Sequence, residues 1–200
     1  LNTRQLRELT KRAAQQTIYS ASDGSVRGAG TATPSSTFGV FIDLITETIS
    51  RCGRITIRTG EESSLRTELE GLIHAYNLIP SHIQTRHTVD NMTALDIHER
   101  LAASGLPPNR QHVQHHYHST ITRLHLAMQR RGAFLATCHT LSHLEHKISR
   151  DTDLNARRAA LAGADKAADE AHDLLSAIKD DKGIEAFPLR IKDVLVEKSA

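Results

Sequence analysis

The sequence predicts an α/β domain in which a five-stranded mixed sheet is flanked by helices. Three β-rich runs with short connections come first, and helical periodicity begins near residue 62. Two further β-rich runs then alternate with helices. Strands separated by helices need crossover connections and pair in parallel, whereas strands joined by short loops pair antiparallel. We therefore expect an antiparallel meander of the first three strands and parallel pairing among the first, fourth and fifth.

The N-terminal third of the chain should hold the meander. Residues 1–16 are polar and basic without a steady apolar stripe, so we expect a linker or a frayed helix, an N-terminal extension. The first strand should end at Asp23, where Gly24 opens a glycine-rich turn. The three strands are expected at residues 18–23, 38–44 and 54–59.

The rest of the chain should alternate helices and strands. Leu65, Leu69 and Leu72 share one helical face, and Pro80 ends that helix. The expected elements are a helix at 62–78, a strand at 83–89, a helix at 91–104, a helix within 110–131, a strand at 133–140 and an alanine-rich helix at 155–179. Residues 17–179 would form the catalytic domain and 180–200 a C-terminal extension.

Composition excludes several classes of protein. The 25 Lys and Arg nearly balance the 23 Asp and Glu, so net charge alone does not indicate a nucleic-acid binder. Cys52 and Cys138 have no CxxC partner, which excludes a disulfide scaffold or a four-cysteine zinc site. No apolar run reaches the about 18 residues of a membrane span, and no signal pattern is present. We expect an intracellular protein, cytoplasmic or nuclear, without a membrane partner.

Three acidic residues occupy positions that are typical of a metal site. Asp23 and Asp90 each follow a predicted strand, and both carboxylates would emerge at one edge if those strands are neighbours. Glu68 lies three residues after Leu65 and four before Leu72, on the apolar face of its helix, where an ionised carboxylate is costly unless neutralised. The alternatives are turn-forming or capping aspartates and a glutamate that reaches water from the margin of the stripe.

A fourth acid is expected on the last helix. Asp165 flanks its apolar stripe, four residues after Leu161 and three before Ala168, and Asp169 points further away. Asp169 is the fallback, and the alternative for Asp165 is an ordinary acid favoured by the helix dipole. Carboxylates that converge with substrate phosphate suit Mg²⁺, and two such ions roughly 4 Å apart can activate water and stabilise the leaving oxygen of a phosphodiester. Without metal these acids repel one another, so Mg²⁺ or Mn²⁺ should stabilise the site.

Five motifs in order resemble the ribonuclease H family and span about residues 17 to 178. They are Asp23-Gly24-Ser25 after a strand, residues 63–69 (SSLRTEL) with Glu68 in the catalytic position, Thr88-Val89-Asp90-Asn91, Ser142-His143 on a loop, and residues 164–168 (ADKAA). The sequence departs from the family in the 22 positions from His143 to Asp165, a longer interval than in its compact members, which keeps Asp169 open as the fourth acid.

The resemblance implies endonucleolytic cleavage of the RNA strand of an RNA–DNA hybrid by a two-metal, in-line mechanism. It implies two Mg²⁺ ions, for which Mn²⁺ can substitute, and products with 3′-hydroxyl and 5′-phosphate ends. The implied metal ligands are Asp23, Glu68, Asp90 and Asp165. In texture the chain is most similar to domains attached to the reverse transcriptases of non-LTR retrotransposons, which would place it within a larger polyprotein.

Further site residues come from loops and basic positions. His143 is the candidate for proton transfer or product release, with His139 as its rival and a plain surface histidine as the alternative. Arg123, Arg130 and Arg131 fall where relatives carry a basic helix and would contact phosphates, unless they form a solvated face. The candidates for telling RNA from DNA by its 2′-hydroxyl are Gly24, Ser25, Arg66 and Asn91.

Two other functions stay open. The first is a catalytically degenerate ribonuclease H-like scaffold or interaction domain, which the presence of all four acids argues against. The second is a DNA-directed relative, a transposase or integrase. Glu68 disfavours it, because those relatives lack the acid of this helix.

Overall fold

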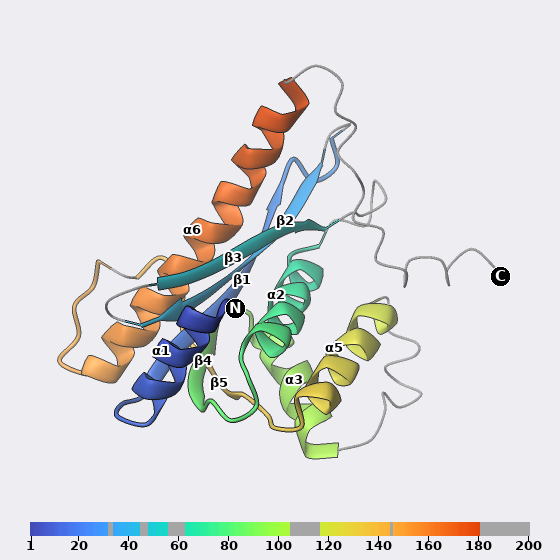
Figure 1. Ribbon diagram of the computed structural model, residues 1–200. Helices are drawn as coiled ribbons and strands as arrows, with labels where there is room; N and C mark the ends of the chain where they lie inside the picture. Colours follow the sequence, from blue (N-terminus) through green and yellow to red (C-terminus); the bar gives the residue numbers. More distant parts are fainter. Residues whose placement is uncertain (32–33, 45–47, 56–62, 105–116, 145, 181–200) are drawn as a thin grey trace.

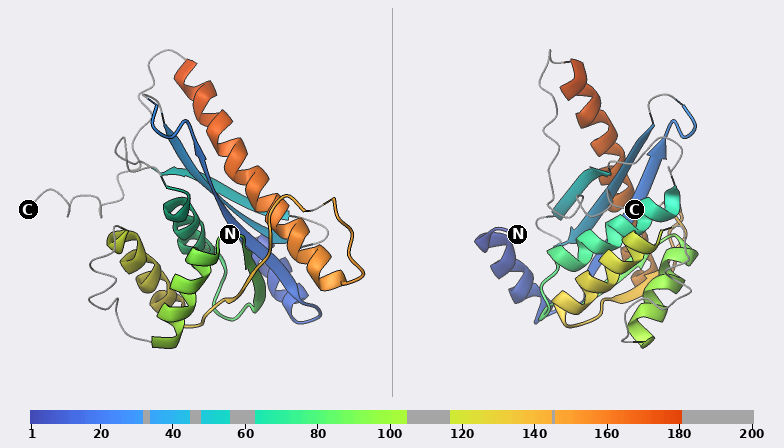
Figure 2. Two further views of the ribbon diagram at one scale, coloured as in Figure 1. Left: turned by 180° about the vertical axis from the view of Figure 1, so that it is seen from behind. Right: turned by 90° about the vertical axis from the view of Figure 1, so that its right-hand side faces the viewer.

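The computed structural model describes residues 1–31, 34–44, 48–55, 63–104, 117–144 and 146–180, with side chains as far as residue 173. Helices α2, α3 and α5 cover one face of a five-stranded sheet, and α6 crosses the other (Figures 1 and 2). The strands are β1 Ile18–Arg27, β2 Ser35–Asp43, β3 Thr48–Ile55, β4 Thr85–Val89 and β5 Ala136–His139. The helices are α1 Thr3–Ala13, α2 Ser64–Leu78, α3 Met92–Ser104, α5 His118–Arg131 and α6 Thr152–Asp180.

The sheet has the predicted topology. Its order is β3-β2-β1-β4-β5, with β1–β2 and β2–β3 antiparallel and β1–β4 and β4–β5 parallel. The prediction that the first strand ends at Asp23 is wrong, because β2 continues to pair with β1 as far as Arg27. On the other side of β1, strand β4 ends at Val89, so Asp23 has no β4 residue paired with it.

The third strand was predicted too late in the chain. It begins at Thr48, and residues 56–59 of the prediction lie outside the described part of the chain. Most side chains of β3 are polar and exposed, since it is an edge strand in which Ile49 and Ile55 are the buried positions. The bounds of β3 are set by its pairing with β2, and the hydrophobic pattern of its own residues does not reveal that pairing.

The segment expected to be a linker or a frayed helix holds the well-capped helix α1. Asn2 and Gln5 form a reciprocal capping box, in which the Asn2 side chain accepts from the Gln5 N–H at 2.8 Å. Leu9 is fully buried in the main core, so α1 is packed against the domain rather than tethered to it. One buried leucine is too little to show as a stripe in the sequence.

A second, smaller core lies under α6. It consists of Ala21, Ala160, Leu161 and Ala164, with Tyr19 and Phe41 against it. Small residues let helix and sheet approach closely, and a Cβ added to Gly39 would lie 2.1 Å from the Ala164 carbonyl oxygen. Because Gly39 is the β2 partner of Asp23, this contact holds the middle of α6 level with Asp23.

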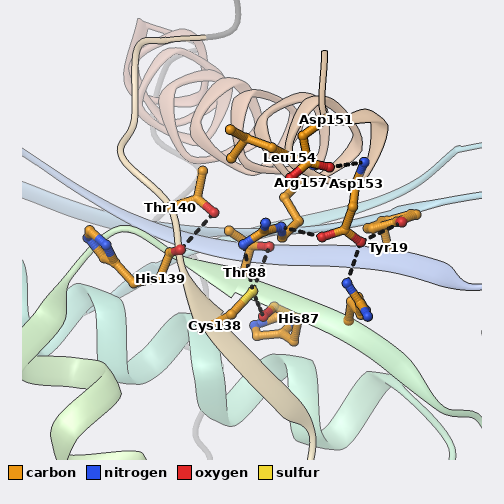
Figure 3. A network of polar contacts seen from close by, with 11 residues as sticks. Tyr19, His87, Thr88, Cys138, His139, Thr140, Asp151, Asp153, Leu154 and Arg157 are labelled. Carbon is orange, nitrogen blue, oxygen red and sulfur yellow. Dashed lines mark hydrogen bonds and ion pairs between the residues drawn. The ribbon is translucent and has the colours of Figure 1, made fainter. Parts of the chain in front are cut away.

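The first turn of α6 is fastened to the sheet by polar contacts (Figure 3). The Asp153 carboxylate accepts from the Tyr19 hydroxyl at 2.8 Å and from Arg86 at 2.5 Å, and it pairs with Arg157 at 2.9 Å. These contacts join the N-terminal end of α6 to β1 and β4. No helix in the described ranges is both long enough and apolar enough to cross a membrane.

Candidate metal centre

Three carboxylates converge where β4 ends beside β1. Asp23 belongs to β1, Glu68 to α2, and Asp90 follows β4 directly. One carboxylate oxygen from each lies within 4.8 Å of the other two. The parallel register pairs Ala21 with Thr88, and the same offset places Asp23 level with Asp90. Two of the three side chains are nearly inaccessible, Asp23 at 5% exposure and Glu68 at 4%.

Gly24 explains how α2 brings Glu68 to this edge. A Cβ at Gly24 would lie 2.3 Å from the Thr67 hydroxyl oxygen and 2.5 Å from the Glu68 nitrogen. Real side chains do not tolerate such distances, so glycine is needed for the first turns of α2 to rest on β1. The Gly24 N–H also donates to the Asp23 carboxylate at 2.7 Å. Gly24, proposed from sequence as a substrate contact, therefore has a structural role within the site.

The electrostatics of the cluster favour binding of a cation. Burial, then the charge of Asp90, raises the pKa of Asp23 from 3.8 to about 7. Burial and the charges of Asp23 and Asp90 likewise raise the pKa of Glu68 well above its ordinary value. Glu68 Oε2 is buried without a hydrogen-bond partner among the described residues. All-oxygen donors, crowded negative charge and an unpartnered carboxylate oxygen fit a hard divalent cation such as Mg²⁺.

The two candidate acids of α6 have different surroundings. Asp165 lies outside the tight three-carboxylate set, but its charge contributes to the raised pKa of Asp23. Its carboxylate is 3.8 Å from His143 Nδ1. Asp169 pairs with Arg27 at 3.1 Å and accepts from the Ser25 hydroxyl at 3.3 Å. Asp169 is thus already partnered by the Arg27 cation, whereas the charge of Asp165 acts on Asp23.

The two candidate histidines also differ. His143 lies on the loop after β5, has a φ of 56° and is 76% exposed, and it lines a shallow hollow with Asp165 and Leu161. A positive φ is uncommon for a residue with a side chain, and such strain concentrates at functional loops. His139 is hydrogen-bonded through Nε2 to the Asp90 carbonyl oxygen at 2.9 Å. His139 therefore holds the backbone that carries Asp90, and His143 is the histidine beside the acid of α6.

The three arginines of α5 that were predicted to contact phosphates have different surroundings. The guanidinium of Arg131, only 8% exposed, donates to backbone carbonyls. The four acceptors are the carbonyls of Ile79, Pro80, Ile83 and Ala133. Four of its five N–H groups are therefore used within the fold. Arg123 is half-exposed but forms an ion pair with the buried carboxylate of Glu70. Arg130 is exposed in the last turn of the helix.

The remaining predicted contacts lie around the carboxylates with partners of their own. The Asn91 side-chain oxygen accepts from the backbone N–H groups of Thr93 and Ala94, both at 3.0 Å, and so caps α3. Arg66 is half-buried in the first turn of α2. Ser25 lies on β1, two residues beyond Asp23 on the same face of the strand, and donates to Asp169.

Two partners of site residues were not predicted. Arg27 could have been found from the sequence, because it follows Ser25 by two positions and so lies on the same face of the strand. There it forms ion pairs with Asp169 and Asp173 of α6. The sequence gives no sign of the burial of Glu70, because this residue lies off the apolar stripe of α2. It is buried where α5 packs against α2.

Comparison with known proteins identifies the fold. No family model matches the chain, and no curated protein matches it. A crystal structure of prototype foamy virus (PFV) protease–reverse transcriptase matches with a TM-score of 0.55 at 14% identity, over 80% of this chain and 21% of that one. The solution structure of the PFV RNase H domain matches with a TM-score of 0.51 at 11% identity, over 80% of this chain and 98% of that domain. The chain thus spans about a fifth of the viral protease–reverse transcriptase and nearly all of the isolated domain.

Proposed function

Since the chain has the ribonuclease H fold, we propose that it is a metal-dependent endonuclease that hydrolyses the RNA strand of RNA–DNA hybrids. The observation that carries this proposal is the convergence of Asp23, Glu68 and Asp90 within 4.8 Å at the edge where β4 ends. Buried like-charged carboxylates are costly in a protein without a ligand to neutralise them. A degenerate scaffold would have no use for that arrangement.

The ligand set is Asp23, Glu68 and Asp90, joined by Asp165 from α6. Two divalent ions, Mg²⁺ or in its place Mn²⁺, would supply activation of the attacking water and stabilisation of the leaving oxygen. The chain's own contribution is to hold the four acids in position. Gly24 lets Glu68 approach Asp23, His139 fixes the backbone at Asp90, and the docking of α6 on Gly39 brings in Asp165.

His143 is proposed to move a proton or assist product release. Its imidazole is exposed and lies 3.8 Å from the Asp165 carboxylate, which places a proton donor or acceptor beside the acid of α6. Arg130, and Arg123 with its half-exposed guanidinium, would contact phosphates. Ser25, Arg66, Asn91 and the backbone at Gly24 would contact the 2′-hydroxyls that identify RNA. Arg131 is excluded from this set.

The chain is further proposed to work inside the cell as one part of a retroelement polyprotein that also carries a reverse transcriptase. The match to a viral protease–reverse transcriptase over 21% of its length supports this context, since there too the ribonuclease H fold is one part of a longer chain. Its non-LTR origin rests on the sequence resemblance alone.

The test is cleavage of an end-labelled hybrid in Mg²⁺ or Mn²⁺. We expect products from the RNA strand, no products after chelation, and loss of cleavage in Asp23→Asn. Asp96→Asn is the matched control, because Asp96 pairs with Arg100 on the exposed side of α3 and should leave the rate unchanged. Failure of the parent chain to cleave at any Mg²⁺ or Mn²⁺ level would support the scaffold alternative. Nicking of duplex DNA instead would indicate a DNA-directed enzyme.

A further inference from the structure

Helix α1 carries a cationic outer face that the proposed catalysis does not use. Its charged residues are Arg4, Arg7, Glu8, Lys11 and Arg12, which is four cations against one acid, a net charge of three positive units. Glu8 pairs with Arg12 at 2.7 Å. Arg4, Arg7 and Lys11 are exposed and recur at i, i+3 and i+7, so they share one side of the helix.

These charges are held in a fixed place. Leu9, on the opposite side of α1, is fully buried in the core that α2 also packs against. The capping box at Asn2 closes the N-terminus of α1, and Thr10 lies 3.3 Å from His82 in the connection that leads to β4. A docked helix presents its cations without the entropy cost of ordering a free tail on binding.

Helix stability accounts for only part of the charge pattern, because Lys11 and Arg12 lie in the last turn of α1, where the helix dipole favours cations, whereas Arg4 does not. The N-terminus of a helix carries positive partial charge and favours acids, yet the first turn of α1 contains no acid and does contain Arg4. A cation there is unfavourable for the helix by a few tenths of a kcal/mol. The arrangement therefore indicates a surface with a binding role outside the helix.

The arginines of α5 are less available to a nucleic acid than those of α1. Arg131 is buried against backbone carbonyls and Arg123 is paired with Glu70, so α5 offers less positive charge to a nucleic acid than its sequence suggests. On the basis of the proposed function, we propose that the outer face of α1 binds the sugar–phosphate backbone of the hybrid, away from the cleaved bond. The hybrid is the polyanion that the proposed reaction brings to this chain, and cations at helical spacing match phosphates without regard to base sequence.

The position of α1 predicts a dependence on duplex length. In Figure 1, α1 lies at the end of the sheet where β1 begins. Five residues of β1 separate Ile18 from Asp23, a distance of about 16 Å at 3.3 Å per residue. At about 3.4 Å per base pair, the contact must lie at least about five base pairs from the bond at the carboxylates. A hybrid of about 6 base pairs centred on the carboxylates extends only about three base pairs to either side, so it cannot reach both sites.

The decisive experiment compares Arg7→Gln/Lys11→Gln with the control Arg100→Gln/Arg150→Gln. The control removes two exposed cations elsewhere. Affinities for hybrids of about 6 and about 24 base pairs are measured by fluorescence anisotropy over a salt series, in an Asp23→Asn background that prevents cleavage. We expect the α1 variant to bind the long hybrid about tenfold more weakly at about 0.15 M salt, with a salt slope smaller by about 1.8. Its binding to the short hybrid should match the control.

Cleavage assays on otherwise intact chains separate this inference from the proposed function. We expect the α1 variant to show a raised KM for the long hybrid with kcat unchanged, and thermal unfolding equal to that of the parent. Equal affinity of variant and control for the long hybrid would overturn the inference while leaving the nuclease in place. Equal losses of affinity for the short and the long hybrid would also overturn it. The same holds if the α1 variant loses affinity for anionic lipid vesicles but not for either hybrid. A parent that binds hybrid through α1 but never cleaves would instead overturn the proposed function.

Discussion

Asp23→Asn should stabilise the protein in the absence of metal, although it removes a central residue of the proposed site. The pKa of Asp23 is raised from 3.8 to about 7, which means that the fold resists ionisation of this carboxyl. The associated stability is therefore fully present below pH 3.8 and is lost as pH rises towards 7. At pH 7 the difference of about 3.2 pKa units corresponds to an upper value of about 4 kcal/mol at 1.36 kcal/mol per unit.

Asparagine has nearly the same shape and no charge, so it removes this cost. Because Glu68 and Asp90 share the repulsion, we expect a gain of about 1–3 kcal/mol in the free energy of unfolding at pH 7.5 in EDTA. That corresponds to a rise in Tm of roughly 3–10 °C for a chain of this size. The advantage should shrink to nothing below about pH 3, where the carboxyl of the parent is protonated in both states.

Metal should reverse the order of stability. Saturating Mg²⁺ stabilises the parent by RT ln(1 + [L]/Kd), about 2.7 kcal/mol at a hundredfold excess over Kd, and should do little for the asparagine variant. Urea unfolding with and without Mg²⁺, using Asp96→Asn as a neutral control, measures both effects. A lower stability of Asp23→Asn in EDTA at pH 7.5, or equal stabilisation of both proteins by Mg²⁺, would refute the reasoning.

Three other outcomes follow from the geometry. Asp165→Asn should lower Mg²⁺-dependent cleavage of hybrid at least about 100-fold, and Asp169→Asn only a few-fold; equal losses in kinetic assays would contradict the assignment. Arg131→Gln should reduce the free energy of unfolding by about 2–4 kcal/mol, since buried carbonyls lose their donors, and leave hybrid affinity unchanged; weaker binding with normal stability would restore its nucleic-acid role. Burial lowers the pKa of His87 to about 3 and of His98 to about 4, so each ring should cost about 1.36 kcal/mol of stability per pH unit as pH drops from about 6 to 4.5; in urea unfolding the parent should therefore lose stability faster over this range than His98→Gln, and parallel profiles would disprove it.

The carboxylate cluster could be anticipated because its members are tied to regular elements. Glu68 stands out as a charge on an apolar helical face, and Asp90 ends a strand. Asp23 follows a predicted strand and precedes Gly24, yet the observed strand continues past it. Strand length depends on how far a neighbouring strand keeps pairing, and a single segment of sequence does not contain that information.

The basic residues could not be assigned from sequence for a different reason. Arg130 and Arg131 are adjacent in the chain, but one points to solvent and the other is surrounded by carbonyls. Which of two neighbouring side chains is buried depends on what packs against the helix, here the connection between α2 and β4. The same limit applies to Glu70, whose burial is created by α5.

The docking of α6 has a consequence for how freely the chain can vary in length. Asp153 fixes the N-terminal end of α6 to the sheet, and the middle of α6 packs on Gly39. The position of Asp165 along the sheet is therefore set by the rise of the helix from Asp153. Twelve residues separate Asp153 from Asp165, about 18 Å of helix. The connection between β5 and α6 can therefore gain or lose residues without moving the acid, while a single residue inserted between positions 153 and 165 would rotate it about 100° away from the other carboxylates.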